Sequence, residues 1–181
     1  MKTINLTERF TRAYDALVKA FFEGTLGKWT CAACACGNII AEAEGCRLTS
    51  DEFKKLCAYR DEQNPETIKK ADYILALWAN KRDEDYDREE KQTVFIPLDE
   101  FKGQYNAAGY TTEEFILIEE AFERNTIIPF HNYGGVSDEK ILEDQFNGLC
   151  AVVEVLLKLD NISPDEKYNA KFREHPKLVT F

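Results

Sequence analysis

The chain has 181 residues, of which 44% are hydrophobic and 31% are charged. These proportions are those of an ordinary globular domain, so they exclude an intrinsically disordered chain and a fibrous repeat. The formal net charge of −10 argues against nucleic-acid binding, because that binding depends on clustered Lys and Arg. We therefore expect a single domain over residues 1–181 with a hydrophobic core of its own.

No segment of the sequence has the apolar character of a signal peptide or of a membrane span. A signal peptide needs an apolar core of about 7–15 residues near the N-terminus, and a membrane helix needs ~20 consecutive apolar residues. Six cysteines in a chain without an export signal predict reduced thiols rather than a disulfide framework. We expect a cytoplasmic protein that binds no membrane.

Apolar residues recur at helical spacing near the N-terminus and predict an amphipathic helix over residues 8–23. Gly24 supplies its stop signal. A second helix is expected to run from near Cys31 to Gly45, with Thr30 as its N-cap. The stripe of the first helix consists of Phe10, Tyr14, Leu17 and Phe21.

Two further helices are predicted from their start signals. Ser50 is expected to cap a short helix, and Pro65 marks the first position of another helix with Ala71 on its apolar face. Residues 81–93 carry charges of both signs and predict an exposed helix end and loop, with an acidic docking patch as the alternative. Residues 94–98 are apolar, but they contain a proline, which favours an edge segment or a packed loop over a sheet.

The C-terminal half repeats the helical pattern. Thr111 and Glu114 have the spacing of a capping box and predict a helix behind them. A long helix is expected after Ser137, and its second half, residues 149–159, is apolar on most sides and is predicted to be the buried central helix. Residue 163 is expected to begin a short final helix. Six or seven helices with little strand signal predict an all-α fold, an irregular helical bundle.

The run Cys31-Ala-Ala-Cys34-Ala-Cys36 is the part of the chain that most resembles a reactive or metal-binding site. In the first turn of a helix, Cys31 and Cys34 would share a face where the helix dipole favours the thiolate form. They are then two ligands of a zinc site, a redox pair, or two buried small residues. Zinc takes four ligands, and His131 is the candidate third. An iron–sulfur cluster is disfavoured because no fourth cysteine lies at a familiar interval.

Motifs of catalysis are missing from the sequence. It contains no GxSxG, HExxH or GxGxxG. The stretch around Gly109 superficially resembles the end of an EF-hand calcium-binding loop, but it lacks the carboxylates at the ligand positions. No two carboxylates are paired in an apolar context, so we predict no catalytic residue and consider a non-enzymatic protein the better interpretation.

Five phrases of the sequence stand out: Gly24-Thr-Leu26, Cys31-x-x-Cys34-Ala-x-Gly37-Asn38-Ile39, Asp144-x-Phe146-Asn147-Gly148-Leu149, Ala151-Val-Val153 and Leu159-Asp-Asn-Ile162. They resemble an uncharacterised family of small proteins from Bacteroidota and their phages. Members of that family often carry the label of a sodium-translocating NADH:quinone reductase component, the one that binds flavin and NADH. That component requires a membrane anchor, a four-cysteine ferredoxin cluster, and flavin- and NADH-binding domains, whose motifs this chain lacks.

The resemblance implies that the cysteine pair, Gly37, Asn38, Asn147 and Gly148 belong together. A glycine inside a strong helix costs about 1 kcal/mol, so Gly148 predicts the close approach of another helix, with Gly37 as its partner. Asn38 and Asn147 would then form a hydrogen bond across the contact. One account is a tight helix crossing without a ligand. The other is a site for a metal or small ligand, built from Cys31, Cys34 and the two asparagines.

We therefore expect a cytoplasmic, non-enzymatic accessory protein that acts by binding another protein, with a mobile element or phage as a candidate source. The first alternative is a metal- or thiol-dependent protein centred on Cys31 and Cys34, with zinc as the candidate metal. The second alternative is a phage structural protein. The sequence determines neither the partner nor the oligomeric state.

Overall fold

The computed structural model describes residues 8–28, 32–57, 67, 69–71, 73–74, 108–129 and 135–163. Most of these residues are helical, the others lie in turns and loops, and none of them belongs to a strand, so the fold is all-α as predicted. An isolated parallel β-bridge joins Lys28 to Pro129. No helix among the described residues is long and apolar enough to cross a membrane.

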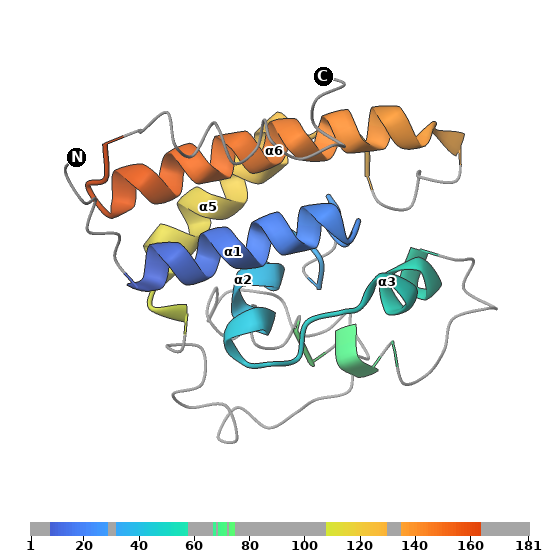
Figure 1. Ribbon diagram of the computed structural model, residues 1–181, viewed down its shortest axis with the longest axis horizontal. Helices are drawn as coiled ribbons and strands as arrows, with labels where there is room; N and C mark the ends of the chain where they lie inside the picture. The colour runs from blue at the N-terminus through green and yellow to red at the C-terminus, as the bar shows by residue number, and fades with distance from the viewer. Residues whose placement is uncertain are drawn as a thin grey trace, which may run out of the picture.

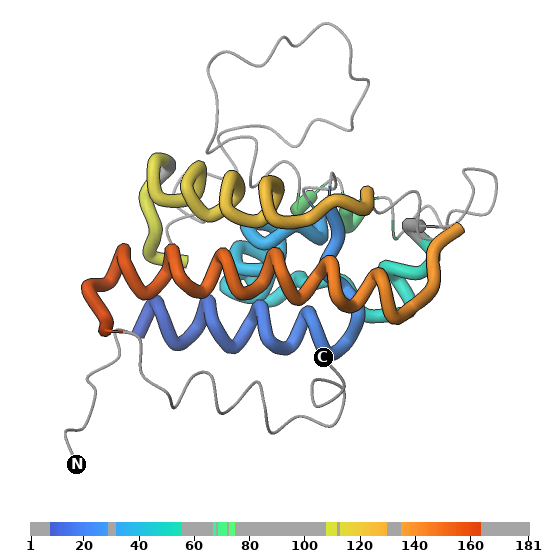
Figure 2. The backbone as a smooth tube through the Cα atoms, turned by 90° about the horizontal axis from the view of Figure 1, so that it is seen from above, coloured from blue at the N-terminus to red at the C-terminus, as the bar shows by residue number. Residues whose placement is uncertain are grey.

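Four helices form a closed ring around the core. They are α1 (Glu8–Phe22), α2 (Ala35–Ala43), α5 (Thr112–Asn125) and α6 (Asp138–Leu159). Helix α6 packs against α1 and α5, and α2 packs against the same two helices. Figure 1 shows α2 below α1, and Figure 2 shows α1 and α5 on opposite sides of α6, which runs antiparallel to both. The interior of this ring is the main hydrophobic core.

The stripe predicted for the first helix is buried in the structure, from Phe10 to Phe21. Helix α1 ends next to Gly24, whose φ of +66° is the left-handed conformation that glycine adopts at helix ends. The fully buried large side chains of the core come from α1, α2, α5, α6 and the loop after α1. They include Phe10, Leu17, Phe21, Leu26, Ile40, Phe115, Ile118, Phe122, Leu149 and Leu156.

A smaller second core lies beside the ring. It joins α2 to α3 (Ser50–Cys57) and to the helical residues 67, 69–71, 73 and 74. Leu48, Phe53, Ala71 and Ile74 are buried there. Figure 1 shows α3 at one end of the molecule, beyond the end of α1.

Two predicted helix starts were wrong, that of α2 by a few residues and that of α3 by one. Helix α2 begins at Ala35 rather than near Cys31, because the Cys34 side chain acts as the N-cap and accepts a hydrogen bond from the Gly37 N–H. The cap of α3 is provided by Thr49, not Ser50. Thr49 Oγ1 accepts from the Glu52 N–H, and the Glu52 carboxylate accepts from the Thr49 N–H.

Both hydrogen bonds of the capping box predicted at Thr111 and Glu114 are present. The prediction for the second half of α6 was wrong in part, because that half is not buried all round. Leu149, Val152 and Leu156 are buried, but Glu154 is exposed and Val155 is only half-buried. The predictions for residues 81–98 and for a final helix after residue 163 lie outside the described residues.

Candidate functional site

Of the three clustered cysteines, the structure describes Cys34 and Cys36. Both thiols are buried and form no disulfide. Cys34 caps α2, and Cys36 Sγ donates a hydrogen bond to the Phe115 carbonyl oxygen at 3.3 Å. Cys31 and His131 lie outside the described residues, so the zinc site built from Cys31, Cys34 and His131 stays a prediction. Among the described residues, no three His, Cys, Asp or Glu side chains gather in an arrangement that would hold a metal ion.

The two candidate ligand-binding asparagines lie in different environments. Asn38 is buried, and its Nδ2 donates to the carbonyl oxygens of Thr25, Ala33 and Cys34 at 3.3, 2.9 and 3.1 Å. Asn147 is exposed on α6. Because the Asn38 amide is occupied by backbone groups on its own side of the core, Asn38 holds the loop between α1 and α2 in place.

The close approach predicted at Gly148 is confirmed, but its predicted partner was wrong. A Cβ atom at Gly148 would lie 2.5 Å from Cγ2 of Thr126 and 2.8 Å from the Phe122 ring. Gly148 is therefore in close contact with α5 and not with Gly37 of α2. The tight crossing between α5 and α6 follows from helix packing and needs no bound ligand.

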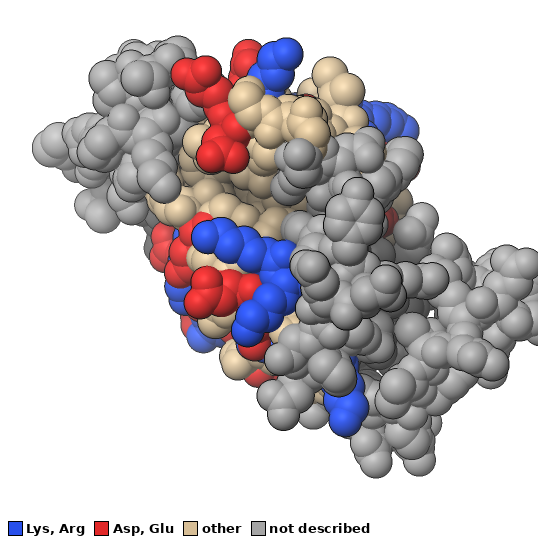
Figure 3. Space-filling model, turned by 90° about the vertical axis from the view of Figure 1, so that its right-hand side faces the viewer, with Lys and Arg blue, Asp and Glu red and all other residues tan. Residues whose placement is uncertain are grey.

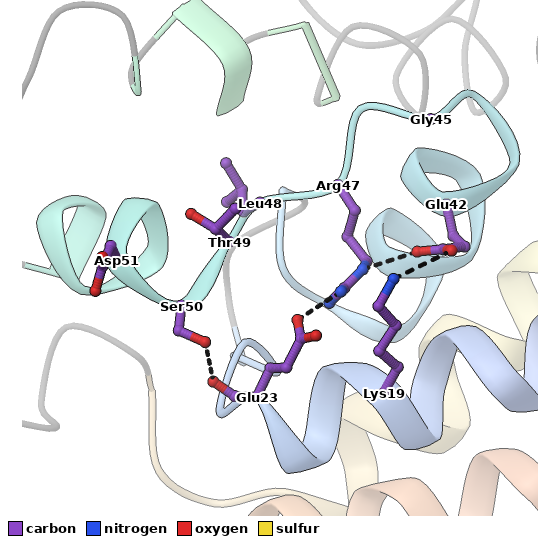
Figure 4. Close-up of a pocket in the computed structure, with 9 residues that line it drawn as sticks. All are labelled: Lys19, Glu23, Glu42, Gly45, Arg47, Leu48, Thr49, Ser50 and Asp51. Atoms are coloured by element: carbon purple, nitrogen blue, oxygen red, sulfur yellow. Dashed lines mark hydrogen bonds and ion pairs between the residues drawn. The ribbon is translucent and has the colours of Figure 1, made fainter.

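A polar hollow of about 610 Å³ lies where α1, α2 and α3 meet (Figure 4). At its centre the Arg47 guanidinium pairs with Glu23 at 2.5 Å and Glu42 at 2.9 Å, and it also donates to Thr25 Oγ1. The Arg47 side chain is 9% exposed, and Lys19 is paired with Glu42 as well. Both cations in the hollow are already neutralised, so the hollow is a structural junction rather than an anion site.

Three titratable groups lie together at the junction between α2 and the second core. Burial raises the pKa of Glu44 and of Tyr73. Burial and the nearby Glu44 carboxylate raise the pKa of the Cys46 thiol to about 11. A thiol with such a pKa is protonated at neutral pH, and a protonated thiol is a poor nucleophile and a poor metal ligand. This group therefore lacks the properties of a catalytic site.

The remaining feature is a groove between α5 and α6, lined by both apolar and charged residues, which we call the α5–α6 groove. It consists of two adjoining hollows of about 440 and 620 Å³. They share Ala121, Arg124, Asn125, Val155 and Lys158, so they form one continuous surface. Figure 2 shows α5 and α6 running side by side. Its further lining residues are Leu117, Glu120, Ile127, Asn147, Cys150, Ala151, Glu154 and Leu159.

Large apolar side chains at the two ends of the α5–α6 groove are open to solvent. The exposed fraction is 49% for Leu117 and 83% for Ile127. Single exposed apolar residues are common on protein surfaces, whereas a continuous apolar surface marks a contact site. Here the exposed side chains adjoin the half-buried Ala121 and Val155, and the polar Arg124, Asn125 and Lys158 line the groove between them.

The backbone that carries Ile127 is held in place from two sides. The buried Asp144 carboxylate of α6 accepts hydrogen bonds from the N–H groups of Ile127 and Ile128, at 2.6 and 3.0 Å. From the other side, the Lys28 ammonium donates to the carbonyl oxygens of Glu123 and Thr126 at the C-terminal end of α5. A cation is favourable at this end of a helix. The exposure of Ile127 is therefore a property of a fixed turn.

The sequence analysis missed the α5–α6 groove, although two signals pointed to it. The run Phe115-Ile-Leu-Ile118 has more apolar residues than one stripe of a helix can bury. Phe115 and Ile118 are buried, and Ile116 and Leu117 face outwards. The second signal was the apolar excess in the second half of α6, which we assigned to burial rather than to an exposed face.

Charges of both signs cover the described surface. Figure 3 shows basic and acidic side chains interspersed on the end of the molecule that carries α3, rather than a field of one sign.

No known protein family, curated protein or solved structure matches this chain. The geometry of its surface is therefore the basis for a functional proposal.

Proposed function

We propose that this protein acts by binding another protein chain, and that the α5–α6 groove is the contact surface. The observation that supports the proposal is the rigidly held, 83% exposed Ile127 at one end of the α5–α6 groove. An apolar side chain on a fixed backbone loses little conformational entropy when a partner covers it. Such pre-organised anchors contribute most of the affinity in protein interfaces.

The thiol in the α5–α6 groove fits a contact role better than a reactive one. Cys150 is half-buried, and burial together with the Glu154 carboxylate raises the pKa of its thiol. At neutral pH this thiol is protonated and behaves as a small apolar side chain. It therefore adds a small apolar contact to the lining of the groove.

Site-specific photo-cross-linking tests the proposal. We would place p-benzoylphenylalanine at position 127 in cells that produce the protein natively, with the exposed position 140 on α6 as the matched control. We expect an adduct from position 127, none from position 140, and loss of the adduct when Leu117→Asp is added. Equal labelling at both positions, or an adduct at 127 that survives Leu117→Asp, would contradict a contact through the groove.

A further inference from the structure

We propose, building on the function proposed above, that Lys28 and Asp144 are positioning residues of the contact surface, and that Lys28 makes the orientation of Ile127 depend on the loop between α1 and α2. Neither Lys28 nor Asp144 is a lining residue of the α5–α6 groove. They act on it through the backbone of the turn that carries its most exposed apolar side chain.

The turn that carries Ile127 lies beyond the end of α5. That helix ends at Asn125, and its C-cap Thr126 is extended, with φ −115° and ψ 142°. The Thr126 N–H still donates to the Phe122 carbonyl oxygen of the helix. The next amide, the Ile127 N–H, donates to Asp144 Oδ1 of α6 instead. The backbone after the C-cap therefore depends for its position on partners outside α5.

Lys28 and Asp144 hold opposite ends of the same peptide group, the one that joins Thr126 to Ile127. Its carbonyl oxygen accepts from the Lys28 ammonium, and its N–H donates to the Asp144 carboxylate at 2.6 Å. A cation at the oxygen and an anion at the N–H polarise the group in the same direction, so each bond strengthens the other. The Lys28 side chain is 13% exposed and Asp144 is buried, so water competes little for either bond. Rotating this peptide group to turn Ile127 away would break both bonds at once.

The same two residues also hold the backbone on either side of this peptide group. Lys28 Nζ donates to the Glu123 carbonyl oxygen at 2.6 Å, and the Lys28 backbone forms the isolated β-bridge with Pro129. The second Asp144 oxygen accepts from the Ile128 N–H at 3.0 Å. The segment that they fix therefore extends from the last turn of α5 to Pro129.

The loop that carries Lys28 is itself fixed by α6 and by the residues before α2. The Leu26 carbonyl oxygen accepts from Gln145 Nε2 of α6 at 2.5 Å. The Gly27 N–H donates to the Ala33 carbonyl oxygen at 2.9 Å, and Leu26 is fully buried in the main core. These contacts set how far the Lys28 ammonium reaches toward α5, so the position of the loop decides whether the turn after α5 is held.

Amide hydrogen exchange of the purified full chain, followed by NMR, tests this role. Lys28→Met keeps an aliphatic side chain of similar length and removes the ammonium, and Asp144→Asn keeps the shape and removes one of the two acceptors. An ammonium cannot accept from the Ile127 N–H, yet we expect both variants to speed the exchange of that amide about tenfold or more, because releasing either end of the peptide group lets the turn open locally. The yield of the photo-adduct from position 127 should fall in both variants.

The control for general destabilisation is Arg9→Met, which breaks an ion pair with Glu114 in the first turn of α5, at the far end of that helix. It should speed the exchange of core amides such as that of Leu17 and leave the Ile127 amide unchanged, because the latter exchanges through local opening. Lys19→Met removes a paired, half-exposed ammonium from α1. It is the control for the loss of a lysine charge and should change neither exchange rate.

The positioning role would be overturned by an Ile127 exchange rate that either variant leaves unchanged, or by one that Arg9→Met raises just as much. It would also be overturned if an adduct formed by the otherwise wild-type chain keeps its full yield in both variants. Absence of any adduct from position 127 would overturn the proposed function instead, and the exchange rates would still decide whether Lys28 and Asp144 hold the turn.

Discussion

The side chains of Asn38 and Asn147 have the same chemistry and different roles. Asn38 is buried and donates to three backbone carbonyl oxygens, while Asn147 is exposed. The sequence marked both positions as members of one group, because a residue type and a phrase around it carry no information about burial. The structure separates a side chain that holds a loop from one that faces solvent.

Exchanging each asparagine for aspartate tests this difference. Asn38→Asp removes the N–H donors and places a carboxylate against carbonyl oxygens, so we expect a loss of about 3 kcal/mol or more in the free energy of unfolding. Asn147→Asp should change it by no more than about 0.5 kcal/mol. Chemical denaturation of both variants and the wild type measures the two effects. Similar effects at the two positions would contradict the assignment of Asn38 as the structural residue.

Helix α6 was predicted in its extent but not in its surroundings. Its start near Ser137 and its apolar spacing were readable, since both depend on neighbours along the chain. The sequence could not predict that Gly148 contacts Phe122 and Thr126 of α5. Both α2 and α5 pack an apolar face against the core, so either helix could have been the partner. The residue pairs of a helix crossing depend on how the helices are arranged in space.

Gly148→Ala tests this crossing. The added Cβ would lie 2.5 Å from Thr126 Cγ2, and we expect the overpacking to cost about 1–3 kcal/mol, partly offset by about 1 kcal/mol from the better helix propensity of Ala. Thermal or urea unfolding should therefore show a net loss of stability. The exposed Gly135, where a Cβ meets nothing within 4 Å, is the matched control.

Relief of the contact provides a second check on the crossing. Thr126→Ser removes Cγ2 but keeps the hydroxyl that donates to the Phe122 carbonyl oxygen. In the Gly148→Ala background, this change should recover part of the lost stability. If Gly148→Ala is as harmless as Gly135→Ala, α5 and α6 do not cross at Gly148.

The four-helix ring is closed at one end by Arg9, which connects three separate parts of the chain. Its guanidinium pairs with Asp160 after α6 at 2.6 Å and with Glu114 of α5 at 2.9 Å. It also lies over the Tyr110 ring, 4.5 Å from its centroid. The Asp160 side chain is 3% exposed, so this ion pair is largely shielded from solvent. One residue of α1 therefore stabilises the relative positions of α1, α5 and α6.

Arg9→Met keeps the aliphatic stem and removes the charge, and we expect it to lower the free energy of unfolding by about 2 kcal/mol because Asp160 is left buried beside an apolar side chain. Arg12→Met is the control. It breaks the exposed pair with Glu8, and its effect should stay within about 0.5 kcal/mol. Urea unfolding of both variants gives the comparison. If Arg12→Met lowers the free energy of unfolding as much as Arg9→Met does, the stabilising role is not specific to Arg9.

The sequence by itself determined the helical class and the apolar stripe of α1. It also determined the capping box at Thr111, because these features depend on contacts within a few residues. The tertiary structure alone decided that Gly148 contacts α5 and that Leu117 and Ile127 stay exposed. Each of these depends on which face of one helix another helix covers. The pattern of apolar residues shows which side chains can be buried, and only the packing shows which of them are.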